Sequence, residues 1–237
     1  MNIAFLTTDT LHHAFFAREL AKAFPIQIAL LESKPPAQPF PCAHAFEAER
    51  DGHERRVFFS GGEASVKDFA PSREFADVNA PEALAVLREA RPEAVLVFGT
   101  GKLKGPLIDM FPGRLVNLHG GDPEEYRGLD SHLWAVYHKE FQSLVTTLHF
   151  VDKGLDTGRI IQQVDVPLSK GMALPELRAA NTRACLELCL SAFSACERLG
   201  RFPSRRQRRK GRYYGAMPAV LKDLCVTRFA AHTGSLP

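Results

Sequence analysis

The sequence predicts an α/β protein with a Rossmann-like, mostly parallel sheet, flanking helices and a short C-terminal tail. Short apolar runs alternate along the chain with segments of helical periodicity, which is typical of β-α-β units. The run at 94–98 is apolar at every position, as expected for a strand that is buried on both faces. The chain has 237 residues, 45% of them hydrophobic, so it can bury one large core.

Each predicted element begins or ends at a local signal. The first apolar run stops at Thr7, and the polar residues up to Thr10 favour the start of a helix that continues until Pro25. Residues 34–81, with Pro35 and Pro36, are less regular and predict mostly loops. We expect strands at 2–6, 26–31, 94–98, 114–118, 144–151 and 159–166. We expect helices at 11–24, 45–56, 82–90, 105–112, 131–141 and 173–199.

The charge is unevenly distributed. The net charge is +3, but residues 201–212 hold seven Lys or Arg and no acid, which leaves the rest of the chain acidic. We therefore expect a domain over residues 1–200, and a basic linker with a short tail over 201–237, whose last elements the sequence does not place.

Composition excludes several classes of protein. No apolar run approaches the roughly 18–20 residues that span a bilayer, and the N-terminus lacks the positive region of a secretory signal. A cytoplasmic protein without a membrane partner is expected. The five cysteines have no C-x-x-C pair, so no metal site is expected. Cys185, Cys189 and Cys196 share one face of a predicted helix, where we expect buried packing thiols.

The common nucleotide folds lack their signatures here. The turn from Thr7 to His13 contains no glycine, whereas phosphate-binding turns need glycine for backbone N–H groups to approach the anion. Neither G-x-G-x-x-G nor a P-loop string is present there, and the chain has no G-x-S-x-G elbow. A nicotinamide dehydrogenase, a P-loop kinase and an α/β serine hydrolase are therefore disfavoured.

Polar residues that can carry acyl-transfer chemistry follow the predicted strands. In open α/β sheets, ligands bind beyond the carboxyl ends of the strands. Asn117 and His119 are two apart, so their side chains face the same side of a strand, and Asp156 lies on a glycine-flanked loop after the next strand. An amide, an imidazole and a carboxylate can stabilise an oxyanion and handle a proton. A structural histidine and a turn-forming aspartate are the alternatives.

Several fixed strings make the pattern specific. Asn117-x-His119 is followed by Tyr126-Arg127-Gly128, and then by a string from His149 to Ile161 that contains Gly-Leu-Asp-Thr-Gly. In this order and spacing, the chain resembles the formyltransferases that use 10-formyltetrahydrofolate. The resemblance is good over residues 80–170 and looser at the first strand and helix.

The resemblance implies the formyltransferase fold and a catalytic trio, Asn117, His119 and Asp156. Asn117 and protonated His119 are implied to stabilise the oxyanion, while Asp156 orients the imidazole and assists proton removal from the acceptor amine. No metal or covalent intermediate is implied. Whether His119 or a water takes the amine proton stays open.

A formyl donor site is also implied. The pteridine of 10-formyltetrahydrofolate is expected against two loops that follow strands. The residues concerned are Phe98, Gly99, Thr100, Gly101, Lys102, Leu103, Asp152, Gly154 and Leu155. Lys102 and Lys104 are expected to be solvated, with the glutamate tail of the folate as the alternative.

The acceptor is less closely defined. His119-Gly120-Gly121 departs from the His-Pro that is common in relatives, whereas the string from Tyr126 to Trp134 resembles the branch that formylates nucleotide-linked amino sugars for surface polysaccharides. A nucleotide-linked amino sugar is the acceptor we expect. Its contacts are expected from Tyr126, Arg127, His12, Arg212, Tyr213 and Tyr214.

These assignments have simpler alternatives. His12 and His13 are expected to be an exposed helix start rather than acceptor contacts, and a surface role for Arg127 is equally expected. Trp134, Tyr137 and Phe141 predict the apolar stripe of a helix. The segment 201–212 is interpreted first as a solvated linker, then as a nucleotide-diphosphate clamp through Arg212, Tyr213 and Tyr214, and last as an RNA-binding strand.

Rival functions share the fold. A methionyl-tRNA formyltransferase is expected to carry a further RNA-facing domain, whereas about 37 residues follow Gly200. A glycinamide ribonucleotide formyltransferase is expected to have a glycine-bearing phosphate turn. A formyl-folate hydrolase and a non-enzymatic RNA-binding module are further alternatives. Nucleic acid is not an expected partner, and the oligomeric state is left open, a homodimer included.

Overall fold

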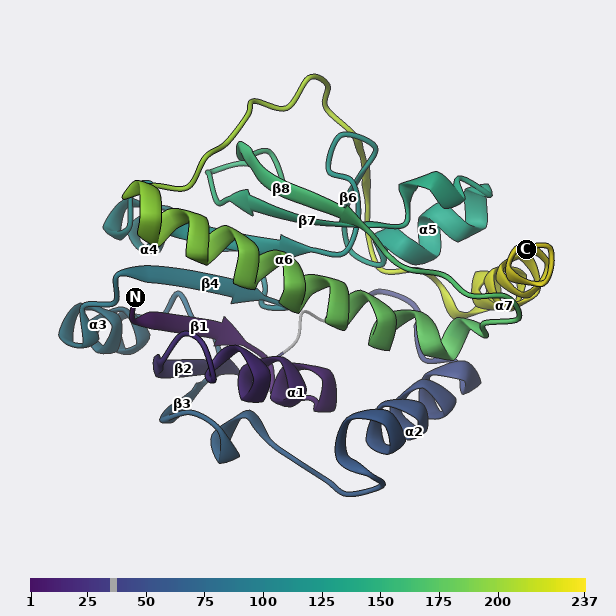
Figure 1. The fold of residues 1–237 in the computed structure, drawn as a ribbon, viewed down its shortest axis with the longest axis horizontal. Helices are drawn as coiled ribbons and strands as arrows, with labels where there is room; N and C mark the ends of the chain where they lie inside the picture. The colour runs from purple at the N-terminus through teal and green to yellow at the C-terminus, as the bar shows by residue number, and fades with distance from the viewer. Residues whose placement is uncertain (35–37) are drawn as a thin grey trace.

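The computed structural model describes residues 1–34 and 38–237. The loop expected at Pro35 and Pro36 lies outside the described residues. Figure 1 shows one twisted sheet, with helices on both of its faces and the chain's C-terminal helix at one end. The α/β, mostly parallel architecture expected from the sequence is confirmed.

The main sheet has seven strands in the order β3-β2-β1-β4-β5-β7-β8. The first five are parallel to one another, whereas β7 is antiparallel to both β5 and β8. The strands of this sheet are β1 (Ile3–Thr7), β2 (Ile26–Glu32), β3 (Ser72–Phe75), β4 (Ala94–Phe98), β5 (Leu115–His119), β7 (Val145–Phe150) and β8 (Ile160–Asp165). A separate parallel pair joins β6 (Tyr126–Gly128) to β9 (Arg212–Tyr214).

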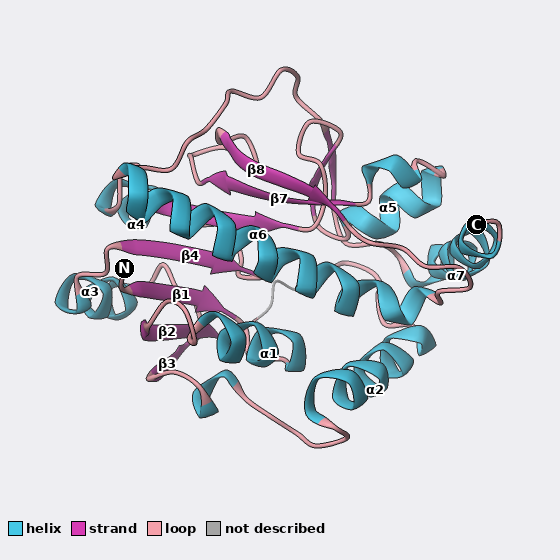
Figure 2. Ribbon diagram, in the orientation of Figure 1, coloured by secondary structure: helices cyan, strands magenta, loops and turns pink. Residues whose placement is uncertain are grey.

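Helices cover both faces of the sheet because the central strands are buried on both sides (Figure 2). The helices are α1 (Leu11–Leu20), α2 (Ala45–Phe59), α3 (Pro81–Ala90), α4 (Gly105–Met110), α5 (Ser131–His138), α6 (Leu177–Leu199) and α7 (Ala219–Gly234). Short 3-10 helices lie at Val66–Asp68, Phe141–Ser143 and Leu174–Glu176. Helices α1 and α6 pack on one face around Phe5, and α3 packs on the other around Leu6.

A third apolar cluster lies beyond the sheet. It joins α5, the start of α6 and α7, and it includes Tyr126, Leu177 and Phe229. Trp134, Tyr137 and Phe141 pack against this cluster but are only partly buried. The residues after Gly200 therefore add a strand to β6 and a helix to this cluster.

Three short strands were not predicted from the sequence. β3, β6 and β9 have three or four residues each, and their pattern does not differ from that of a loop. The pairing that makes them strands is with residues distant in sequence, as in Arg127 opposite Tyr213. Cys185 and Cys189 are buried as expected, whereas Cys196 is partly exposed.

In the part of the chain that the structure describes, no helix is long and apolar enough to cross a membrane. Among the same residues, no group of three or more His, Cys, Asp or Glu side chains is placed to hold a metal ion.

Candidate active site

His119 is the last residue of β5 and is buried in the wall of a large cavity. Its Nε2 lies 2.9 Å from the main-chain oxygen of Tyr126. Because a carbonyl oxygen can only accept, Nε2 carries a hydrogen in both the neutral and the protonated imidazole. The proton that His119 can gain or lose is therefore on Nδ1, which lies 3.6 Å from Oδ2 of Asp156.

Asp156 is held in place from several directions. Its Oδ2 accepts a hydrogen bond of 2.8 Å from the main-chain N–H of Gly128, and its side chain is only 8% exposed. Burial alone raises the pKa of this carboxyl, but the charge of His119, contacts from His149 and the Gly128 N–H outweigh burial and hold the pKa well below 3.8. Asp156 therefore stays ionised beside the imidazole.

Asn117 faces the cavity from the same strand as His119, as the two-residue spacing predicted. Its Nδ2 donates to Nε2 of His149 over 3.2 Å. Nδ1 of His149 in turn donates to the oxygen of Phe150 over 2.8 Å, which leaves Nε2 as the acceptor in the neutral ring. The amide of Asn117 is thus oriented by a histidine, and its second N–H has no partner among the described residues.

His149 belongs to the site although no role for it was predicted from the sequence. It lies directly opposite Asn117 in the antiparallel pairing of β5 with β7, and 3.5 Å separate its Nε2 from Oδ1 of Asp156. Only the register of this antiparallel pair could have placed His149 beside Asn117. The sequence predicted a mostly parallel sheet, and a parallel pairing of the two strands does not bring these residues together.

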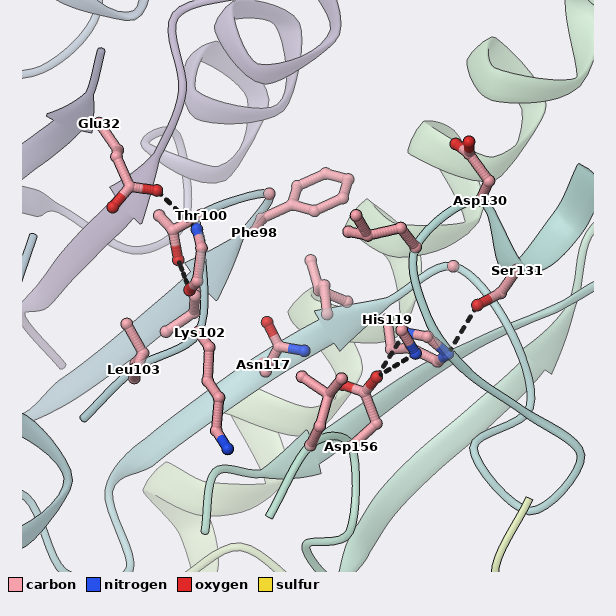
Figure 3. Close-up of a pocket in the computed structure, with 18 of the residues that line it drawn as sticks. Glu32, Phe98, Thr100, Lys102, Leu103, Asn117, His119, Asp130, Ser131 and Asp156 are labelled. Carbon is pink, nitrogen blue, oxygen red and sulfur yellow. Dashed lines mark hydrogen bonds and ion pairs between the residues drawn. The ribbon is translucent and has the colours of Figure 1, made fainter. Parts of the chain in front are cut away.

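The loop that carries Asp156 approaches the site from a direction that the sequence did not predict. Because β7 is antiparallel to β5, its carboxyl end lies beside the start of β5, where the Val151 N–H donates to Leu115. The loop after β7 folds back, and Asp156 takes a left-handed φ of 52° that aims its carboxylate at His119. Figure 3 shows Asn117, His119 and Asp156 grouped in the middle of the cavity.

The cavity has a volume of about 1050 Å³ and two ends. One end is lined by the loop after β4 and the loop after β7. It includes all of the residues expected to contact the donor: Phe98, Gly99, Thr100, Gly101, Lys102, Leu103, Asp152, Gly154 and Leu155.

Glu32 holds the loop after β4. It ends β2 and is buried, and its Oε2 accepts the Gly101 N–H over 2.5 Å while Oε1 accepts from Val78 over 3.3 Å. In Figure 3 its carboxylate points at this loop, across the cavity from Asp130 and Ser131. Lys104, from the same loop, pairs with Asp77 over 2.8 Å, whereas the Lys102 side chain makes no hydrogen bond or ion pair with the described residues.

The other end of the cavity is lined by α1, α2, α5 and α6. Arg50 and Arg178 lie there, and both contact Oδ1 of Asp51. Arg178 also makes two hydrogen bonds of 2.6 Å to the fully buried carboxylate of Glu54. Because carboxylates already pair with both guanidinium groups, an anionic group such as a phosphate can bind only to the N–H groups that these carboxylates leave free.

His12 and His13 are buried, so the expected exposed helix start is wrong. Phe98 packs against both rings, and Nδ1 of each ring lies 2.9 Å from Oγ1 of Thr10. Burial lowers the pKa of His12 well below 6.5 and that of His13 to about 3, so both rings are neutral. His12 lines the cavity, as expected of an acceptor contact.

The structure does not bring three of the expected acceptor residues to the large cavity. The hydroxyl of Tyr126 donates to Glu140, and Tyr126 is fully buried. Arg212 pairs with Glu140 over 2.7 Å, and Tyr214 stacks on Trp134 with ring centroids 4.8 Å apart. These three side chains are engaged within the protein.

The remaining two expected acceptor residues lie elsewhere. Arg127 is 5% exposed, so its interpretation as a surface arginine is wrong. It lines a second, smaller cavity rather than the large one. Tyr213 is 67% exposed and lines both cavities.

Several contacts join the basic segment 201–212 to the rest of the protein, although most of its basic side chains are exposed. Arg205 pairs with Glu124 over 2.7 Å, Arg209 pairs with Glu125, and Gln207 donates to the oxygen of Asp156 over 2.8 Å. The acidic partners come from the chain just before β6. The segment therefore packs beside the loop that carries Asp156.

Comparison with known proteins defines the class. Residues 15–184 match the family model described as formyl transferase. The chain therefore belongs to the formyl transferase family, whose members are enzymes that move formyl groups. Recognition of this family from the sequence is confirmed.

Curated relatives of known activity match part of the chain. The chain is 32% identical to a methionyl-tRNA formyltransferase of Acetivibrio thermocellus over 127 residues, which is 51% of this chain and 40% of that protein. The chain spans less than half the length of this and the next curated relatives.

Two solved structures share the fold. A likely sugar N-formyltransferase from Mycobacterium tuberculosis aligns with a TM-score of 0.62 and 20% identity over 90% of this chain and 75% of that one. The formyltransferase PseJ from Anoxybacillus kamchatkensis aligns with a TM-score of 0.54 and 19% identity, over 91% and 86% of the two chains. PseJ was crystallised with a UDP-linked formamido sugar and tetrahydrofolate.

Proposed function

We propose that this protein is an N-formyltransferase that moves a formyl group from 10-formyltetrahydrofolate to the amine of a nucleotide-linked amino sugar. The observation that carries the proposal is the convergence of Asn117, His119 and Asp156 in the wall of one large cavity. A donor at one end and an acceptor at the other would meet at these three side chains.

The three side chains Asn117, His119 and Asp156 can stabilise negative charge on the formyl oxygen and can exchange a proton with the acceptor amine. The free N–H of Asn117 is available to the formyl oxygen as negative charge develops on it. Nδ1 of His119 is the atom that exchanges a proton, and it lies 3.6 Å from Oδ2 of the ionised Asp156. This arrangement supports His119 as the acceptor of the amine proton, because its other nitrogen is committed to Tyr126.

The donor end suits a flat heterocycle with a reactive formyl group. 10-Formyltetrahydrofolate supplies the activated formyl carbon, and the protein supplies its position. The loop after β4 offers main-chain groups, and Glu32 holds that loop by the Gly101 N–H. Leu103 and Val97 add apolar walls.

The acceptor end suits an amine that carries phosphate. Arg50 and Arg178 replace the clamp expected from Arg212 and Tyr214, because they line the cavity and those two residues do not. PseJ, which shares this fold, was crystallised with a UDP-linked formamido sugar, and this supports a nucleotide-linked amino sugar. Glycinamide ribonucleotide also carries a phosphate, so both compounds need to be tested.

A ligand screen tests the choice of acceptor. Thermal shift is measured with 5-formyltetrahydrofolate present, against amino-sugar nucleotides, nucleoside diphosphates and glycinamide ribonucleotide. A ligand at 100 times its Kd should stabilise the protein by about 2.7 kcal/mol. Stabilisation and formylation of glycinamide ribonucleotide alone would refute the sugar assignment.

Substitution tests the chemistry. We predict that His119→Ala, Asn117→Ala and Asp156→Asn each lower kcat by roughly 10²-fold or more, since each removes an oxyanion donor or a proton-handling group. Formylated product is measured in a single-turnover assay. His53→Ala, in α2 but outside the lining of the cavity, is the matched control, and near-normal turnover by His119→Ala contradicts the assignment.

A further inference from the structure

Asp156 holds its place in the active site with a strained main chain. Its φ of 52° lies in the left-handed region, which is costly for a residue other than glycine. Such a conformation persists only where the surrounding structure determines it. The hydrogen bonds of the loop around Asp156 therefore identify the groups that keep its carboxylate beside His119.

Gln207 binds the main chain of this loop at two points. Its Nε2 donates to the oxygen of Asp156 over 2.8 Å and to the oxygen of Gly158 over 2.9 Å. Because both partners are carbonyl oxygens, the amide nitrogen of Gln207 and not its amide oxygen must face them. One side chain thus joins the residue with the left-handed φ to the end of its loop.

Arg127 holds the residue that precedes Asp156. Its Nη1 donates to the oxygen of Leu155 over 3.3 Å, and its Nε donates to the oxygen of Gly211 over 3.0 Å. Arg127 is only 5% exposed, so water competes little for these hydrogen bonds. The guanidinium therefore connects the loop to the segment that leads into β9.

The segment 204–211, which carries Gln207, is itself fixed against the domain on both sides of that residue. Arg205 exchanges two main-chain hydrogen bonds with Ile160, of 2.8 and 2.9 Å. On the other side, a Cβ on Gly211 would lie 2.6 Å from a main-chain oxygen of the chain before β6, so the two main chains are in direct contact. Gln207 is therefore presented to the loop from a fixed support.

We propose that Gln207 is a positioning residue, which together with Arg127 clamps the loop of Asp156 in the conformation needed for formyl transfer. The inference rests on the proposed function and extends it to the segment 204–211. That segment lies outside residues 15–184, which match the family model. Gln207 is also absent from the lining of the large cavity, so its effect on the reaction would pass through Asp156.

The clamp acts by removing alternative conformations of the loop. Without Gln207, the oxygens of Asp156 and Gly158 lose their side-chain partner, and water can replace it in other loop conformations. The main chain of Asp156 can then relax from its left-handed φ, which moves the carboxylate away from His119 and from the Gly128 N–H. A displacement of about 1 Å at a reacting group can lower a rate by about 10²-fold.

Hydrogen exchange, measured by NMR on the protein without ligands, tests the clamp. The Gly128 N–H reports on the carboxylate because it donates to Oδ2 of Asp156 over 2.8 Å. Gln207→Met keeps the length of the side chain and removes its donors. We expect the Gly128 N–H to exchange at least about fivefold faster in this variant, the range for loss of a hydrogen bond. Gln27→Met loses a similar bond, to the Ala90 oxygen, and should leave the rate unchanged.

Kinetics test the consequence for the reaction. The probes are 10-formyltetrahydrofolate as donor and a UDP-linked 4-amino sugar as acceptor. Gln207→Met should lower kcat by about tenfold and change both KM values much less, because the residue acts on a proton-handling group and not on either substrate. Gln27→Met should keep the kcat of the unmodified chain.

The outcomes separate this proposal from the one on which it rests. An unchanged exchange rate at Gly128 in Gln207→Met overturns the clamp. Faster exchange with unchanged kcat shows that Gln207 only attaches the segment 204–211 to the domain, and the positioning role is then wrong. No formylation of the acceptor probe by the unmodified chain counts against the proposed function, and the exchange rate alone then decides the clamp.

Discussion

At the scale of single residues, the site depends on which ring nitrogen each histidine commits to the main chain. His119 gives Nε2 to Tyr126 and keeps Nδ1 for chemistry, whereas His149 gives Nδ1 to Phe150 and keeps Nε2 for Asn117. Two histidines about 6.3 Å apart between ring centroids thus have different uses. One exchanges a proton beside Asp156, and the other orients an amide.

His149 is therefore predicted to be a positioning residue. His149→Ala should lower kcat by about tenfold, less than the loss of Asn117 itself, because the amide remains but is no longer oriented. The KM of the folate should change little. His149→Gln keeps an acceptor near Asn117 and should restore part of kcat. Equal kcat for the unmodified chain and His149→Ala, measured under saturating substrates, would contradict this role.

At the scale of elements, side chains from distant parts of the chain hold the loops of the site. Glu32 at the end of β2 anchors the loop after β4, and Glu124 anchors the segment before β9. Both carboxylates accept main-chain N–H groups, Gly101 and Val78 for Glu32, and Arg208 for Glu124. Each loop therefore depends on one buried acid.

Glu32→Gln tests the first anchor. The amide has one acceptor oxygen where the carboxylate has two, so one of the N–H groups of Gly101 and Val78 loses its partner. We expect the KM of the folate to rise by about tenfold and kcat to change less. Glu74→Gln, an exposed acid of β3, is the control. An unchanged KM for the folate would show that the loop does not need this anchor.

Limited proteolysis tests the second anchor. Trypsin cleaves after Lys and Arg, which are abundant in 201–212, and the ion pair of Arg205 with Glu124 should protect this segment. Glu124→Ala should accelerate cleavage there by about fivefold or more, because a buried hydrogen-bonded acid is lost. Glu63→Ala removes an exposed pair with Arg55 and should leave the rate unchanged. Equal cleavage of the Glu124 variant would restore the interpretation as a free linker.

At the scale of the whole molecule, folding buries several histidines in their neutral form. Burial lowers the pKa of His12 well below 6.5, that of His13 to about 3 and that of His132 to about 4. The unfolded chain binds protons on these rings below pH 6.5, and the folded chain does not. Stability is therefore complete above pH 6.5 and is lost as the pH falls toward 4.

This acid sensitivity can be measured by urea unfolding at several values of pH. Each such histidine should add a slope of up to about 1.4 kcal/mol per pH unit between pH 6.5 and its folded pKa. His132→Gln, which can still donate to the Val145 oxygen, should remove one such contribution. Leu129→Gln changes no titratable group and should keep the full slope. A slope that His132→Gln leaves unaltered would contradict burial of the neutral ring.

Much of the fold could be predicted from local pattern. The alternation of apolar runs with helical segments predicted the central strands and most helices, because burial on a sheet or helix face imposes a short period. The same pleat placed Asn117 and His119 on one side of β5. Short sequence motifs were also sufficient to predict the family without the structure.

What only the tertiary structure decided depends on residues far apart in sequence. His149 faces Asn117 because β7 runs antiparallel to β5, and periodicity within a strand contains no information on its direction relative to a neighbour. His12 is buried by Phe98, and Arg205 is neutralised by Glu124, 81 residues away. The sequence by itself determined which residue types were available at each strand end. Their burial, protonation and partners were decided by packing, because solvation and Coulomb energies depend on distance in space.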